Sequence, residues 1–324
     1  MKASLTEDQA WAVVRATPPG REPVQVAHPT APEATVAVAR DGSWSSDAFV
    51  TDGARRVLDL YLPLRRRRAW VLGQMGQSLD GRIATESGHS HYVTGPDDIR
   101  RLHRLRALAD AVLVGAGTAA SDDPRLTVRE VEGPDPVRVV LDPHGRLDPG
   151  LGIFTDGASP TLVVRGEDGE EAPELNPPTG PAEGGAGAGV EEILLPLDPS
   201  PGIRPERIVS ALRARGLRRL LVEGGGITVS RFLEAGLLDR LHVTVAPLIL
   251  GSGRPAFTLE PVETLGEALR PACRTFALGA DVLFELDLRA GAEEEDQEDD
   301  GAGDAGEEHQ ETVGHGDGHA LGAR

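Results

Sequence analysis

Hydrophobic residues between positions 69 and 288 form short apolar runs of strand length, and segments with helical spacing separate several of these runs. A run of four to eight apolar residues bounded by turn-forming residues is typical of a strand buried on both faces. The final run, VLFELDL, instead alternates apolar and polar positions, which predicts a strand with one exposed face. The predicted strands cover residues 69–75, 111–115, 137–141, 161–164, 193–195, 219–222, 241–246 and 282–288.

Three segments between these runs carry the signals of helices. A proline and two aspartates at 96–98 open the first, because proline suits the first helical turn and acidic side chains suit the positive end of the helix dipole. Its apolar positions then recur at helical spacing over 99–109. The other two helices cover 205–215 and 228–235, and a glycine follows each. The alternation predicts an α/β layered fold with a mostly parallel sheet, helices on both faces and an antiparallel strand at one edge.

Residues 1–68 read as an appended region to which the sequence assigns no role. We expect a short helix at 5–15, a proline-rich linker at 16–33, a strand after it, and a helix at 52–62 that ends before a proline. The arginines at 65–68 favour a solvated or acid-paired linker over a binding patch.

Residues 69–289 form the predicted core, and two low-complexity segments fall outside its pattern. An insertion of Gly, Pro, Ala and Glu at 166–192 is expected to be flexible. Residues 290–324 contain twelve acidic residues and one arginine and should be disordered, because they cannot bury apolar area. Three histidines in this tail have no folded scaffold, so we predict no metal site there.

The composition excludes several classes of protein. A net charge of −19 argues against a general nucleic-acid binder. Cys273 is the single cysteine, so neither an intramolecular disulfide nor a cysteine-rich zinc site is possible. No apolar run reaches the ~18 residues of a membrane span, and the N-terminal residues lack a signal-type apolar core. We therefore expect a soluble, cytoplasmic protein that binds no membrane.

Two glycine-rich turns follow predicted strands. The first is Gly115-Ala116-Gly117-Thr118, where glycine lets a backbone approach a ligand and leaves amide groups free to bind phosphate. The second is the segment EGGG at 223–226, at a strand end where open α/β sheets bind ligands. A tight strand exit and a close-packed turn with a helix-capping Glu are the structural alternatives. Because the turns follow different strands, they favour a shared dinucleotide cleft.

Polar residues near these turns offer groups for a phosphorylated ligand. Residues 121–129 (SDDPRLTVR) combine two aspartates with two arginines, and arginine suits planar, bidentate recognition of phosphate. Ser90, His91 and Thr94 precede the first core helix, and Arg106 lies among its apolar positions, where a buried arginine needs an anionic partner. A surface loop with local ion pairs is the alternative for 121–129, and structural or exposed positions are favoured over catalytic roles for His91 and His103. No Gly-x-Ser-x-Gly or His-Glu-x-x-His motif supports a hydrolase or a zinc protease.

Several of these segments together resemble one family, the RibD-type C-terminal reductase domain of riboflavin-biosynthesis proteins. The resemblance rests on the segments SLDGRIA, HYVTG, LHRLRALADAVLVGAGT, DDPRLTVR, RVVLD, LLVEGGG and an Ala-Pro pair followed by glycine, in the family's order over residues 69–288. It implies a three-layer, dihydrofolate-reductase-like fold and a homodimer. It also implies an NADPH-dependent reduction of a ribosylaminopyrimidine 5′-phosphate from its ribosyl to its ribityl form.

The resemblance also implies roles for the glycine turns. Gly115, Gly117 and Thr118 would line the diphosphate of NADPH on one side, and Gly224 and Gly225 would line it on the other. Hydride transfer itself is the chemistry of the nicotinamide, so the protein must orient the substrate carbon, anchor the phosphate and supply a proton.

Five further residues match positions around the substrate. Ser90, Arg106 and Arg129 match residues that hold the substrate phosphate. Asp122 and Glu223 match polar residues around the ribose and the hydride-transfer centre, and Asp122 is the candidate proton donor.

Other positions concern specificity. Arg146 or His144 could hold the 2′-phosphate that distinguishes NADPH, since arginine is a common partner there. Gln74, a predicted substrate-side residue, stands where many members have lysine, and Tyr92 stands where some have tryptophan. One cysteine cannot build the zinc site of the deaminase half. A stand-alone reductase is therefore expected. A same-fold reductase of another carbonyl, imine or pterin-like compound and a non-catalytic nucleotide-binding module remain the alternatives.

Overall fold

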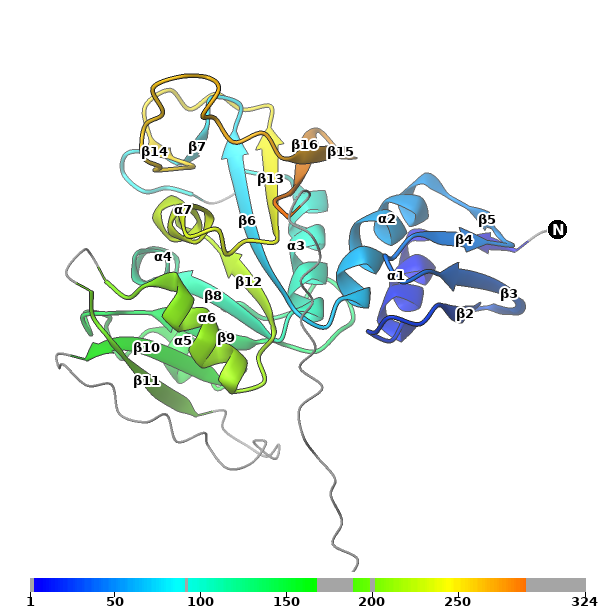
Figure 1. The fold of residues 1–324 in the computed structure, drawn as a ribbon, viewed down its shortest axis with the longest axis horizontal. Coiled ribbons are helices and arrows are strands. Elements are labelled where there is room, and N and C mark those ends of the chain that lie inside the picture. The colour runs from blue at the N-terminus through cyan, green and yellow to red at the C-terminus, as the bar shows by residue number, and fades with distance from the viewer. Residues whose placement is uncertain (1–2, 91–92, 168–188, 199–201, 290–324) are drawn as a thin grey trace, which may run out of the picture. The chain divides into compact units, whose positions relative to one another are not determined.

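A nine-stranded sheet forms the centre of the core, with the strand order β11-β10-β9-β8-β12-β6-β13-β16-β15 (Figure 1). The computed structural model describes residues 3–90, 93–167, 189–198 and 202–289. His91, Tyr92, most of the predicted insertion and the predicted acidic tail lie outside the described residues. The strands of this sheet are β6 (Trp70–Ser78), β8 (Ala111–Gly115), β9 (Val137–Leu141), β10 (Thr161–Glu167), β11 (Val190–Pro196), β12 (Arg219–Glu223), β13 (Arg240–Ala246), β15 (Ala272–Leu278) and β16 (Asp281–Asp287).

The remaining elements flank this sheet or belong to the N-terminal region. The helices are α1 (Glu7–Ala16), α2 (Asp52–Arg66), α3 (Pro96–Leu108), α4 (Ala116–Asp122), α5 (Gly152–Thr155), α6 (Pro205–Ala214) and α7 (Gly226–Glu234). The strands outside the nine-stranded sheet are β1 (Ser4–Leu5), β2 (Val24–His28), β3 (Ala31–Val38), β4 (Trp44–Ser46), β5 (Phe49–Val50), β7 (Arg82–Ala84) and β14 (Arg254–Pro255). In the described ranges, no helix is both long and apolar enough to span a membrane.

The strands from β11 to β13 pair in parallel, whereas β16 and β15 run antiparallel to their neighbours. The predicted mostly parallel sheet with an antiparallel edge is therefore confirmed. The edge holds one strand more than predicted, β15. This strand was missed because it follows a long irregular segment and most of its residues are exposed. An exposed strand of this kind lacks the apolar run that revealed the buried strands.

Helices cover both faces of the sheet, and the side-chain alternation of the strands explains why. Along β6, Trp70 and Leu72 pack into one apolar cluster with α3, while Val71 packs into a second cluster with α6 and α7. Leu221 on β12 joins the first cluster and Val222 the second. Successive strand residues point to opposite faces, so a strand covered by helices on both sides must be apolar throughout.

The N-terminal region contains a three-stranded antiparallel sheet, β2-β3-β4, and the two helices α1 and α2. Residues 16–33, predicted as a linker, in fact contain β2. Helix α2 continues past Pro63 to Arg66, so the predicted end before the proline was wrong. Tertiary contacts override the local signal, because Arg65 donates to the Thr17 carbonyl at 2.6 Å and Arg66 is buried. Neither arginine is a solvated linker residue.

Several hydrogen bonds and ion pairs join this region to the reductase core. Arg104 of α3 forms an ion pair with Glu7 at 2.9 Å, and the Tyr61 hydroxyl donates to the Arg101 carbonyl at 3.3 Å. The Trp11 indole donates to the carbonyl of Glu132 at 2.8 Å. The division at residue 68 stays a prediction, and these contacts span it.

Candidate active site

The two glycine turns lie at the carboxyl ends of neighbouring parallel strands. Strand β8 ends at Gly115, and α4 starts directly after it; β12 ends at Glu223, and α7 starts at Gly226. Both turns line one cavity of about 530 Å³. Eight residues that the sequence predicted for the site line it: Gln74, Ser90, Gly115, Gly117, Thr118, Asp122, Gly224 and Gly225.

The glycine turns pack against each other through two threonines. A Cβ atom on Gly115 would lie 2.5 Å from the Thr228 hydroxyl of α7. A Cβ atom on Gly224 or Gly225 would lie 2.9 or 3.0 Å from the Thr118 side chain of α4. Both of these glycines also adopt a φ of +64°, which L side chains rarely take. The close approach of the turns therefore requires glycine, whereas Gly117 has open space beside it.

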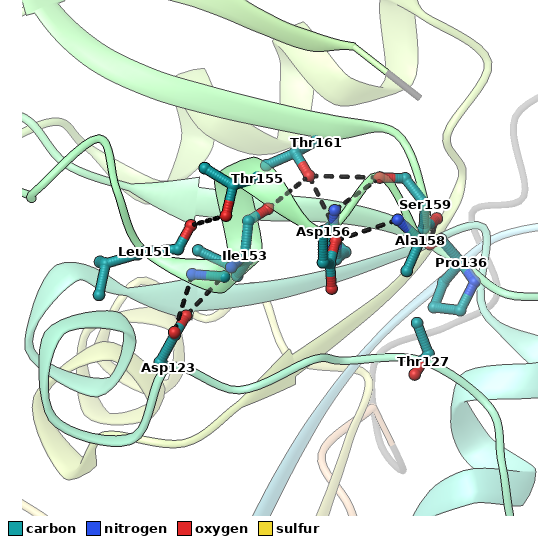
Figure 2. Close-up of polar contacts among 12 residues, drawn as sticks. Asp123, Thr127, Pro136, Leu151, Ile153, Thr155, Asp156, Ala158, Ser159 and Thr161 are labelled. Carbon is teal, nitrogen blue, oxygen red and sulfur yellow. Dashed lines mark hydrogen bonds and ion pairs between the residues drawn. The ribbon is translucent and has the colours of Figure 1, made fainter. Parts of the chain in front are cut away.

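Ser90 and Asp122 meet at this cavity. The Ser90 hydroxyl lies 3.3 Å from both carboxylate oxygens of Asp122, and the Ser121 hydroxyl donates to Asp122 at 2.9 Å. Asp123, the next residue, has a left-handed φ of 38° and accepts hydrogen bonds from the first amides of α5 at 2.8 and 3.0 Å (Figure 2). Asp123 thus caps a helix outside the cavity, while Asp122 lines the cavity beside Ser90.

Arg106 and Glu223, both predicted for the site, do not line the cavity. Arg106 Nε and Nη2 donate to the two Glu223 carboxylate oxygens at 2.8 and 2.7 Å, and Nη1 donates to the Thr127 carbonyl at 3.2 Å. Both side chains are buried. Burial alone would lower the pKa of Arg106, but the Glu223 carboxylate outweighs it and raises this pKa. The predicted anionic partner of Arg106 is therefore a residue of the protein.

Arg129 lies on the surface next to this pair. It donates to the Thr127 hydroxyl at 2.6 Å, and its backbone amide donates to His103 Nδ1 at 3.0 Å. Partial burial, followed by the neighbouring Arg106 and Arg125, lowers the pKa of Arg129. Burial, followed by the nearby Arg106 and Arg129, lowers the pKa of His103 to about 4, so its ring is a neutral hydrogen-bond acceptor at neutral pH. The structural role predicted for His103 agrees with this environment.

The residues predicted for the cofactor 2′-phosphate also lie outside the cavity lining. Arg146 and His144 are exposed in the turn after β9. This turn is held by Asp142, which accepts from the amides of Arg146 and Leu147 at 2.9 and 3.1 Å. These hydrogen bonds explain the shape of the turn without a bound phosphate.

Gln74 is a buried residue of β6 that lines the cavity. Its register partners are Glu223 on β12 and His242 on β13, so the three residues form a row across one face of the sheet. Aligned residues on adjacent strands point to the same face. A neutral amide therefore stands in line with the paired carboxylate of Glu223.

Two arginines of the cavity escaped sequence reasoning. Arg231 lies on α7 and Arg254 on β14, and both line the cavity. In the sequence, Arg231 occupies an ordinary polar position of an amphipathic helix. The sequence alone does not show which polar positions of a helix border a cavity. Arg254 follows a Gly-Ser-Gly segment, and these glycines could have marked a turn close to the site. In the described part of the chain, no group of three or more histidine, cysteine or acidic residues could hold a metal ion.

Similarity to known proteins identifies the family of the chain. Residues 69–283 match the model of the RibD C-terminal domain. The chain is 35% identical over 231 residues to the 2,5-diamino-6-ribosylamino-4(3H)-pyrimidinone 5′-phosphate reductase of Methanothermobacter thermautotrophicus, which covers 68% of this chain and 99% of that protein. It is 33% identical over 196 residues to the riboflavin biosynthesis protein RibD of Aquifex aeolicus, which covers 60% of this chain but only 51% of that protein.

A solved structure of RibD from Acinetobacter baumannii superimposes with a TM-score of 0.54 at 27% identity, over 74% of this chain and 65% of the other. The chain thus spans about two thirds or less of the RibD proteins that it matches and nearly all of the archaeal reductase. The α/β fold class and the family resemblance are confirmed by these matches. The chain belongs to the RibD C-terminal domain family of pyrimidine reductases.

Proposed function

We propose that this protein is an NADPH-dependent reductase that converts the ribosyl group of a phosphorylated ribosylaminopyrimidine to a ribityl group. The observation that carries the proposal is the meeting of two glycine turns, from neighbouring strands β8 and β12, at one cavity beside Ser90 and Asp122. A homodimer is part of this proposal.

Features of the glycine turns support a dinucleotide cofactor in this cavity. Gly117 leaves open space, and Gly224 and Gly225 have no side chains of their own to cover their amides. Helix α7, which has nine residues, starts at the cavity. The Thr228 and Val229 amides donate to the Gly225 carbonyl, so the amides of Gly226 and Ile227 are the ones left for a ligand. Amides at a helix N-terminus favour phosphate oxygens. These residues would hold the diphosphate of NADPH, which supplies the hydride when bound.

Asp122 and Ser90 are assigned to the proton that balances this hydride. Reduction of the ribosyl group at C1′ would break the bond from C1′ to the ring oxygen, and that oxygen would take a proton. Ser90 Oγ can pass a proton to the oxygen, and the Asp122 carboxylate is placed to receive and return protons at Ser90. A carboxylate beside Ser90 repels phosphate, so this pair suits the sugar better than the phosphate.

Arg254 is the favoured anchor for the substrate phosphate. It lines the same cavity as Ser90, and its guanidinium approaches the position of a Cβ on Gly88 to 2.9 Å. Arg106 is paired with Glu223, and Arg129 does not line the cavity. We therefore assign Arg106 and Glu223 to holding the end of β12, from which the second glycine turn starts.

The test is NADPH oxidation by the purified protein, followed by absorbance. The substrates are 2,5-diamino-6-ribosylamino-4(3H)-pyrimidinone 5′-phosphate and the corresponding aminouracil phosphate. Turnover with either is expected, and it should be lost in an Arg254→Gln variant at low substrate but recover at high substrate. Binding of NADPH with no turnover of either compound would contradict the substrate assignment.

Gln74 supports a second candidate, a reductase of another carbonyl, imine or pterin-like compound. Its amide cannot supply the positive charge that lysine would place in the row beside Glu223. Complementation of a riboflavin-requiring reductase mutant separates the two candidates. Growth would favour the ribosylaminopyrimidine, and growth only with Gln74→Lys would favour the alternative.

A further inference from the structure

Arg231 is a half-buried cation in the wall of the cavity with no role in the reaction as proposed so far. Its Nη2 donates to the Ile203 carbonyl at 2.9 Å. Within the described ranges, no carboxylate forms an ion pair with it, whereas Arg106, Arg138 and Arg219 each have one. A guanidinium has five N–H donors, so a single neutral carbonyl leaves most of its capacity for an anion.

The guanidinium lies at one defined end of the cavity. Arg231 Nη1 is 3.2 Å from the position of a Cβ on Gly202, and Pro143 Cγ lies 3.7 Å from the same point. Gly202 has a φ of +99°, a conformation that L side chains rarely adopt. Pro143 follows β9 closely, so Arg231 marks the β9 end of the site.

The surroundings of Arg231 differ in character from the opposite end. Leu141, Pro143, Ile203, Pro205 and Ile208 line the cavity at the β9 and α6 end. Such an apolar lining suits a flat, uncharged base.

The other end holds four polar side chains, those of Gln74, Ser90, Asp122 and Arg254, beside the apolar Met75, Ile83 and Ala84. Figure 1 shows β9 and β10 with α6 on one side of α7, and the β7–β14 pair that holds Arg254 on the other. The polar end is therefore where the reacting groups gather.

The glycine turns lie between these ends, because the strand order runs β9-β8-β12-β6. A dinucleotide with its diphosphate at the turns places one nucleoside at each end. The nicotinamide belongs at the polar end with the substrate, so the adenosine belongs at the apolar end beside Arg231.

We infer that Arg231 binds the 2′-phosphate on the adenosine ribose and thereby selects NADPH over NADH. This inference rests on the proposed reductase function. Arginine matches phosphate geometry with two parallel hydrogen bonds, and the apolar wall raises the strength of that contact. Arg231 therefore replaces Arg146 and His144, which lie outside the cavity lining, as the residue for this phosphate. The two cavity arginines then correspond to two phosphates, Arg254 to that of the substrate and Arg231 to that of the cofactor.

The experiment measures equilibrium binding by titration calorimetry to the full chain, without turnover. The ligands are NADPH, NADH, 2′,5′-ADP and 5′-AMP, and the variants are Arg231→Gln, Arg231→Lys and the control Arg146→Gln. Arg231→Gln should weaken NADPH and 2′,5′-ADP by about ten- to a hundredfold, the effect of losing hydrogen bonds to a charged group. NADH and 5′-AMP should change by less than about threefold. Arg231→Lys should retain an intermediate preference, because it keeps the charge and loses the fork.

The outcomes separate this inference from the proposed function. Preference for NADPH that survives in Arg231→Gln, or that disappears in Arg146→Gln, overturns the role of Arg231 and leaves the reductase proposal intact. A wild-type protein that binds neither dinucleotide refutes the proposed function itself. Circular dichroism of each variant confirms that the fold is retained, and Arg231→Lys gives the answer if Arg231→Gln does not fold.

Discussion

Arg106 and Glu223, 117 residues apart in the chain, hold each other in a buried ion pair with two parallel hydrogen bonds of 2.8 and 2.7 Å. The pair joins α3 to the carboxyl end of β12. It therefore connects one helical layer to the strand from which a glycine turn enters the cavity. Because both groups are buried, each depends on the other for its charge.

Arg106→Leu should lower the free energy of unfolding by about 3–5 kcal/mol, because Glu223 then stays buried without its partner. Replacing both residues with leucine should cost less than the single change, since no unpaired charge remains. Urea unfolding measures both effects. Arg165→Leu, which breaks an exposed pair with Glu192, is the control and should cost no more than about 1 kcal/mol. Equal stability of Arg106→Leu and wild type would show that the pair is not formed.

The pair also shows how far sequence reasoning reaches. The helical periodicity around Arg106 indicated a buried arginine and hence an anionic partner. Its identity depended on which face of β12 each residue occupies, and a one-residue shift moves a side chain to the opposite face. Val222 packs toward α7, so Glu223 points to α3 and away from the glycine turn that follows it. The strand itself was predicted, but the face of the sheet to which each of its side chains points was not.

Gly115→Ala should reduce both stability and NADPH affinity, because its new Cβ would lie 2.5 Å from the Thr228 hydroxyl. Thr228→Ala in the same chain removes that oxygen and should restore much of the stability. Gly117→Ala is the matched control: nothing lies within 4 Å of its Cβ, so it should fold normally and weaken only NADPH. Thermal unfolding and calorimetric titration measure the two properties. A destabilised Gly117→Ala with unchanged affinity would contradict the assignment of the turn to the diphosphate.

Lowering the pH should destabilise the protein partly through His103. Burial and the nearby Arg106 and Arg129 lower the pKa of His103 to about 4 in the folded state, against about 6.5 when unfolded. Between these values the unfolded chain binds more protons, so stability falls as the pH drops from about 6.5 to about 4 and is fully present above that window. His103→Asn keeps an acceptor for the Arg129 amide without titrating there. The difference in unfolding free energy between the wild type and His103→Asn should narrow as the pH falls. A difference that stays constant would show that protonation of His103 is not coupled to folding.

The cavity was only partly foreseeable for a related reason. The glycine turns, Ser90 and Asp122 are local signals, and all of them line it. Arg231 and Arg254 come from a helix and a loop whose side chains reach the cavity only through the packing of α7 and β14. Arg146 looked suitable because it follows a strand, yet Asp142 binds the amides of its turn and the side chain is exposed. Spacing along the chain identifies backbone turns better than it identifies the direction of long side chains.

Asp122→Asn offers the sharpest test of the proposed chemistry. The change keeps the shape of the side chain and its contact with Ser90 but removes the carboxylate that would handle the proton. General acid–base catalysis contributes about 10²–10⁴-fold, so kcat should fall within that range while the dissociation constant of NADPH changes by less than about twofold. Ser90→Ala should reduce kcat as well, and the double variant should be no slower than Asp122→Asn, because the two residues act in one proton path. Asp123→Asn is the neighbouring control: its carboxylate caps α5, so it should lower stability and leave kcat nearly unchanged. If the losses in kcat, expressed as activation free energies, add in the double variant, Ser90 and Asp122 act separately. The proton would then need another donor.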